Sequence, residues 1–124
     1  MVGAECVNTA SGVSLRCYIS MPLFPDQRLI AIARDGRETA AISIGEEDLP
    51  SVWRLFETDP AWYKSGPREF QDSSGYGVRV SVCGEARDQL CVTLLDGGEE
   101  LDSVPFLPAQ MKTVRQMFLA VKEP

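Results

Sequence analysis

Two arginines at matched positions, Arg16 and Arg79, are the side chains in this sequence best placed to contact a ligand. Each belongs to the polar set of a segment that alternates apolar and polar residues, so we expect both to point outward from a β-sheet. Tyr18 shares the face of Arg16, and Arg37 is expected on a nearby strand. Cationic and aromatic side chains on an open sheet form a surface on which unpaired bases stack. The same arginines could instead serve only to keep the exposed face of a sheet soluble.

Residues for enzymatic chemistry are scarce. The chain has no histidine, so Ser-His-Asp and Cys-His arrangements are excluded. Carboxylates gather at Glu46–Asp48 and at Glu99–Asp102, which we interpret as a helix N-terminus and a solvated strand edge. Gly75 and Gly77 do not lead into a helix, so they do not form a phosphate-binding loop. The sequence predicts a protein that is not an enzyme and has no catalytic residue, metal or cofactor.

The four cysteines are Cys6, Cys17, Cys83 and Cys91. They contain no C-x-x-C motif, and no histidine is present to complete a zinc site. Cys83 and Cys91 could face each other across a hairpin, which makes a cross-strand disulfide conceivable. We favour the interpretation that all four fill sheet positions as small apolar residues.

The chain is acidic, with a formal net charge of -6. The electrostatic field of such a molecule opposes the binding of nucleic acid and attracts a basic protein partner. No segment approaches the roughly 18 apolar residues of a membrane span. Residues 1–5 lack the basic and apolar regions of a signal peptide, so we expect a cytoplasmic protein that does not insert into membranes.

Most of the first half of the sequence is repeated in the second half. Residues 7–19 match residues 70–82. In this match Gly12 aligns with Gly75, and Arg16 aligns with Arg79. The hairpin signal Asp35-Gly36 matches Asp96-Gly97, and the later apolar residues also align. The sequence thus predicts one domain, 1–124, built from repeat 1 (1–62) and repeat 2 (63–124).

Each repeat is expected to contain four strands and one helix. The alternating pattern and the turn residues predict strands over 4–8, 13–21, 28–34 and 37–44, and then over 68–72, 76–83, 89–95 and 99–106. Apolar residues at helical spacing follow in both repeats: Leu49, Val52, Trp53 and Phe56, then Met111, Val114, Phe118 and Val121. The expected fold is α+β: two tandem ββββα repeats with antiparallel sheets, packed as one pseudo-twofold domain.

Two aromatic segments are candidate protein interfaces. Leu23 and Phe24 lie in a proline-flanked loop, and Trp62 and Tyr63 lie in the connector between the repeats. Aromatic side chains are enriched at protein interfaces, although these residues could equally fold back over the core. A homodimer through sheet edges or through Leu23 and Phe24 is a further expectation.

The order of strand, Ser-Gly turn, strand with an outward arginine, hairpin, strand and helix resembles PUR-repeat proteins and, more loosely, Whirly proteins. The resemblance spans both repeats and implies binding of single-stranded DNA or RNA on curved sheets. It places Arg16, Tyr18, Arg37 and Arg79 at the nucleic-acid-facing positions. Each strand here carries one arginine, whereas such proteins present many basic side chains. Our leading hypothesis is therefore a non-enzymatic module that binds a protein, such as an inhibitor, immunity or adaptor protein, with single-stranded DNA or RNA binding as the alternative.

Overall fold

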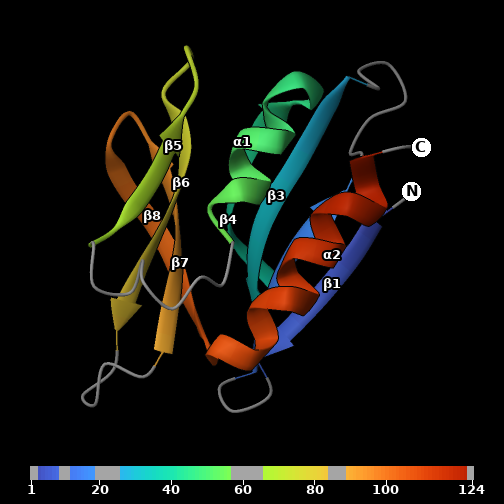
Figure 1. The fold of residues 1–124 in the computed structure, drawn as a ribbon, viewed down its shortest axis with the longest axis vertical. Helices are drawn as coiled ribbons and strands as arrows, with labels where there is room; N and C mark the ends of the chain where they lie inside the picture. The colour runs from blue at the N-terminus through green and yellow to red at the C-terminus, as the bar shows by residue number, and fades with distance from the viewer. Residues whose placement is uncertain (1–2, 9–11, 19–25, 57–65, 84–88, 123–124) are drawn as a thin grey trace.

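The computed structural model describes residues 3–8, 12–18, 26–56, 66–83 and 89–122. Within these residues the chain forms two four-stranded antiparallel sheets and two α-helices, an α+β fold (Figure 1). The first sheet has the order β1 (Gly3–Asn8), β2 (Val13–Tyr18), β3 (Gln27–Arg34) and β4 (Arg37–Gly45). The second has β5 (Arg68–Gln71), β6 (Tyr76–Cys83), β7 (Gln89–Asp96) and β8 (Glu99–Phe106). Helix α1 (Leu49–Arg54) follows β4, and α2 (Met111–Lys122) follows β8.

The strands form where apolar and polar residues alternate. In β2, Leu15 and Cys17 are fully buried, and they pair with the buried residues Ile32 and Ile30 of β3. One face of each sheet therefore belongs to the core, and we call the opposite face the outer face. The predicted strand over 13–21 is described only as far as Tyr18, because residues 19–25 lie outside the described part of the chain.

The two hairpins β3–β4 and β7–β8 turn at residues with positive φ. Asp35 and Gly36 have φ values of 53° and 80°, and Gly97 and Gly98 have values of 62° and 86°. This pattern is typical of a type I′ turn, which favours Asp-Gly and Gly-Gly. The turn at Asp35-Gly36 is confirmed, but its counterpart is Gly97-Gly98, one residue later than the sequence match at Asp96-Gly97. Each hairpin also contains one β-bulge, after Ile32 in the first and after Leu94 in the second.

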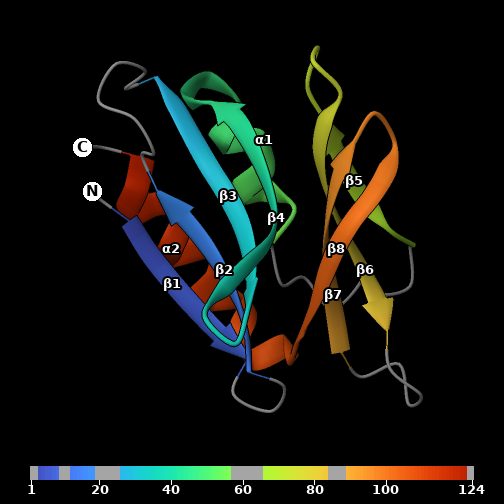
Figure 2. The same ribbon diagram turned by 180° about the vertical axis from the view of Figure 1, so that it is seen from behind.

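The helices begin after short 3-10 turns. Glu46–Asp48 precedes α1, as the acidic cluster predicted, and Pro108–Gln110 precedes α2. Helix α2 lies at the end of the chain but packs against β1 and β2 of the first sheet. Figure 2 shows α2 and α1 on the same side of that sheet, leaving its outer face uncovered by helices. None of the helices in these segments is long and apolar enough to cross a membrane.

The core is one cluster of buried side chains from both sheets and both helices. At its centre Phe56 and Phe118 stack, with ring centroids 5.1 Å apart. Helix α1 buries Leu49 and Val52 as predicted, whereas Trp53 is only partly buried at the edge of the core. Phe56 is buried as predicted, but it lies in a turn after the end of α1 at Arg54.

Gly75 and Gly77 have structural roles. Gly75 has a φ of 92°, and its carbonyl oxygen accepts a hydrogen bond from the Gly97 N–H at 2.8 Å. At Gly77, a Cβ atom would collide with the carbonyl oxygen of Phe70 on the neighbouring strand β5. The glycines therefore allow the backbone to turn and the strands to approach closely, uses for which only glycine is suited.

Candidate binding surfaces

The outer face of the first sheet brings Arg16 and Tyr18 together around a carboxylate. Arg16 Nη1 lies 3.5 Å from Glu38 Oε2, and the Tyr18 hydroxyl donates to the same oxygen at 2.9 Å. Burial raises the pKa of Tyr18 to about 12, and the hydrogen bond to Glu38 acts in the same direction. Both side chains predicted to contact a ligand are thus engaged with an acidic neighbour.

The outer face of the second sheet repeats this arrangement around Arg79. Its Nε lies 2.9 Å from Glu69 Oε1, and its Nη1 lies 2.6 Å from Glu100 Oε1. The Glu100 side chain is 64% exposed. One arginine between two carboxylates leaves this part of the face with a negative charge.

The predicted cationic residues do not form a single surface. Arg16 and Arg79 lie in different sheets. Arg37 is exposed at the start of β4. It precedes Glu38 directly, so its side chain points to the opposite face of the strand. The predicted interface residues Leu23, Phe24, Trp62 and Tyr63 all lie outside the described residues.

The three glutamates that pair with these arginines, Glu38, Glu69 and Glu100, were not among the predicted site residues. Glu69 is directly opposite Arg79 in the β5–β6 pairing. That partner could have been found from the turn, because a hairpin turn sets the register of its strands. Glu38 is different, because its position beside Arg16 depends on the β-bulge in the β3–β4 hairpin.

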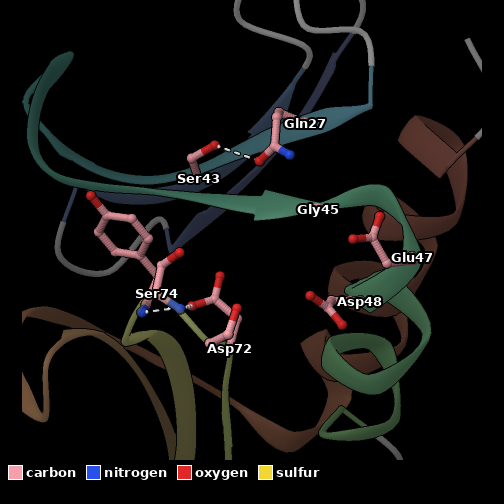
Figure 3. A pocket seen from close by; sticks show the side chains of 9 residues that line it. Gln27, Ser43, Gly45, Glu47, Asp48, Asp72 and Ser74 are labelled. Atoms are coloured by element: carbon pink, nitrogen blue, oxygen red, sulfur yellow. Dashed lines mark hydrogen bonds between the residues drawn. The ribbon is translucent and has the colours of Figure 1, made fainter.

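A polar pocket of about 280 Å³ lies between the end of β4 and the β5–β6 turn (Figure 3). The carboxylates of Glu47, Asp48 and Asp72 line it, together with polar side chains that include Ser43 and Ser74. Asp72 Oδ1 accepts hydrogen bonds from the backbone N–H groups of Ser74 and Tyr76 at 2.9 and 3.0 Å, which fixes the turn. No group of three or more acidic or cysteine side chains in the described segments is arranged to hold a metal ion. The pocket adds negative charge to this side of the molecule.

An acidic side chain of β8 links the two sheets. Asp102 of β8 accepts two hydrogen bonds from Arg34 of β3, at 2.8 and 3.0 Å, and one from the Thr39 hydroxyl. The expectation of a solvated strand edge is wrong for this residue, because its side chain is only 18% exposed. Mainly through the hydrogen bond from Arg34, these contacts lower the pKa of Asp102 to about 2.

The free energy of unfolding should therefore decrease at acidic pH as Asp102 becomes protonated. Its pKa is lower in the folded chain than in the unfolded chain, where 3.8 is the ordinary value. The contribution of Asp102 to stability is complete above pH 3.8 and is lost as the pH falls through about 2. Because Arg34 is 44% exposed and screened by solvent, we expect about 1–2 kcal/mol. Urea unfolding of the wild type and Asp102→Asn between pH 2 and 6 measures it. A constant difference between the two proteins over that range would contradict the assignment.

The cysteines divide into two kinds. Cys83 and Cys91 form a disulfide across β6 and β7, with their Cα atoms 5.9 Å apart, so the interpretation of these two as reduced side chains is wrong. Cys6 and Cys17 are free and buried, and burial raises the pKa of the Cys17 thiol to about 12. A thiol with so high a pKa is a poor nucleophile at neutral pH. Disulfides persist mainly in oxidising compartments, and the cytoplasmic location stays a prediction.

No protein-family model matches this sequence, and no curated protein matches it.

Proposed function

We propose that this protein is a non-enzymatic binding module whose partner is a protein with a basic surface. The observation that carries the proposal is the pairing of Arg16 and Arg79 with glutamates on the outer sheet faces. A surface that binds single strands needs cations that can pair with phosphates. Here those cations are already matched by carboxylates of the same sheet, within a chain of net charge -6. A basic protein surface is the complementary partner.

We also propose that the domain consists of two ββββα repeats related by a pseudo-twofold axis, the PUR-like arrangement expected from the sequence. The β-bulges fall at equivalent positions of the two sheets. The turn hydrogen bonds are equivalent as well: Asp35 N–H donates to the Gly12 carbonyl at 3.3 Å, and Gly97 N–H donates to the Gly75 carbonyl at 2.8 Å.

Contacts between the helices support the same symmetry. Phe56 and Phe118 occupy equivalent positions of the repeats and stack on each other. Trp53 and Arg115 are also equivalent, and the Arg115 guanidinium lies over the Trp53 ring. Around a twofold axis, residues near the axis meet their own equivalents. Two such contacts support a proposed axis that passes between α2 and the segment formed by α1 and Phe56.

The partner class can be tested with two labelled probes at low ionic strength, a short arginine-rich peptide and single-stranded DNA or RNA. Fluorescence anisotropy should detect saturable binding of the peptide and none of the oligonucleotides. Glu69→Gln/Glu100→Gln should weaken peptide binding by about tenfold, because it removes two charges and exposes Arg79. Asp96→Asn/Glu99→Gln removes the same charge from the exposed end of the β7–β8 hairpin. This control should change the affinity for the peptide by less than about threefold.

Two outcomes would overturn the proposal. Equal weakening in both double variants would mean that the peptide responds to net charge and not to the outer face. Oligonucleotide binding that is lost in Arg16→Ala/Arg79→Ala would instead favour the single-strand-binding alternative.

A further inference from the structure

The strongest unassigned feature of the molecule is a pocket on the helices, away from the acidic outer faces. It has a volume of about 200 Å³ and is lined by Trp53 of α1 and by Lys112, Arg115 and Gln116 of α2. The guanidinium carbon of Arg115 lies 4.1 Å from the centroid of the Trp53 ring. Figures 1 and 2 place α1 and α2 together on the core side of the first sheet. The pocket is thus formed where the two helices meet.

Two donors at this site have no acceptor in the described part of the chain. Trp53 Nε1 and Arg115 Nε are buried atoms, and neither has a hydrogen-bond partner among the described residues. A buried donor without an acceptor costs free energy, so such groups in native proteins call for an explanation. An acceptor group bound in the pocket would supply one.

The charge of the pocket specifies the kind of acceptor. The described side chains that line it carry two positive charges and no negative charge. Lys112 and Arg115 are three residues apart on α2 and therefore share a face of the helix. Neither has an ion pair with a described residue, in contrast to Arg16 and Arg79 on the sheets. In an acidic chain, this is a local positive surface.

The stack on Trp53 prepares Arg115 to bind an anion. A guanidinium held over an aromatic ring has fewer orientations available, and its fork of N–H donors matches the oxygens of a carboxylate or phosphate. Ligand pockets for whole small molecules usually measure about 300–1,000 Å³. A volume near 200 Å³ suits one anionic group with a small organic body.

We propose that the Trp53–Arg115 pocket binds an oxyanion, the carboxylate or phosphate group of a small organic anion. Arg115 and Lys112 supply the positive charge, and the indole N–H of Trp53 donates a further hydrogen bond. This site is opposite in charge to the outer faces and independent of the protein partner proposed above. The protein would therefore carry two binding surfaces of opposite charge.

Nuclear magnetic resonance tests the site directly through the indole N–H signal of Trp53. The chain has two tryptophans, and Trp62→Phe identifies which signal belongs to Trp53. The probes are phenyl phosphate and benzoate, with sodium chloride at equal ionic strength as the reference. We expect a saturable shift of the Trp53 signal with at least one probe, and their relative affinities distinguish phosphate from carboxylate as the preferred group.

Matched variants show whether the charge of the pocket causes the binding. Arg115→Gln should weaken probe binding by about tenfold or more, and Lys112→Gln should weaken it less. Arg37→Gln removes the same charge from an exposed strand position and should leave the affinity unchanged. The proposal is overturned if neither probe gives a saturable shift in the wild type. It is also overturned if Arg37→Gln weakens binding as much as Lys112→Gln, a comparison that stands even if Arg115→Gln does not fold.

Discussion

Replacement of Phe56 or Phe118 with alanine is expected to lower the free energy of unfolding by about 3–5 kcal/mol. The two rings are 0% and 2% exposed and stack at 5.1 Å, with an angle of 27° between their planes. Each substitution removes apolar surface from the core and leaves a cavity where the two helices meet. Urea unfolding of the single variants measures the loss. Leu107→Ala, at a position that is 51% exposed, is the matched control and should cost less than about 0.5 kcal/mol.

The double variant tests the symmetry as well as the packing. If Phe56 and Phe118 are equivalent residues at a pseudo-twofold axis, the two single substitutions should cost similar amounts. The double variant should cost less than their sum by about 0.5–1.5 kcal/mol, since the stacking contact can be lost only once. Additive costs would mean that the rings do not stack in solution. A large difference between the single variants would argue against equivalent environments.

The parts of this fold that the sequence predicted depend on local signals. Alternation in β2 placed Leu15 and Cys17 in the core, and Asp35-Gly36 marked a hairpin because both positions need positive φ. Helical spacing likewise identified the buried residues of α1. Each of these signals is contained in a few consecutive residues and needs no knowledge of a distant partner.

The parts that were missed depend on long-range contacts. Whether Asp102 is solvated depends on where Arg34 of the other sheet lies. The disulfide between Cys83 and Cys91 joins residues two positions out of register, because Cys91 pairs with Ser81. The candidate sites show the same limit. Arg16 and Arg79 were identified as outward residues. The positions of the carboxylates that neutralise them depend on the register of the strands and on a β-bulge.

Arg28 is the residue whose burial is least expected from the sequence. It lies on the core face of β3 and is 0% exposed. Its Nη2 lies 3.6 Å from Glu46, and its Nη1 donates to the Gln27 carbonyl at 3.3 Å. In the proposed repeat the matching position of the second sheet is Leu90, which is also 0% exposed. A leucine thus occupies, in the second half of the chain, the place that a buried cation occupies in the first.

Arg28→Ala should therefore cost about 3 kcal/mol or more, and Arg28→Leu less than about 1 kcal/mol. Alanine leaves the space of a large side chain empty. Leucine fills much of that space and removes the cost of keeping a guanidinium away from water, and the half-exposed Glu46 is then hydrated by solvent. Urea unfolding of both variants provides the comparison, with Leu90→Ala as a measure of the same position in the other sheet.

The difference between these two variants shows what the buried charge does for the fold. If leucine is tolerated, Arg28 adds little net stability, because its ion pair only offsets the cost of its own burial. If Arg28→Leu is as damaging as Arg28→Ala, the charge itself stabilises the first sheet through Glu46 and the Gln27 carbonyl. Each sheet would then be stabilised by a different interaction at this position, an ion pair in the first and apolar packing in the second.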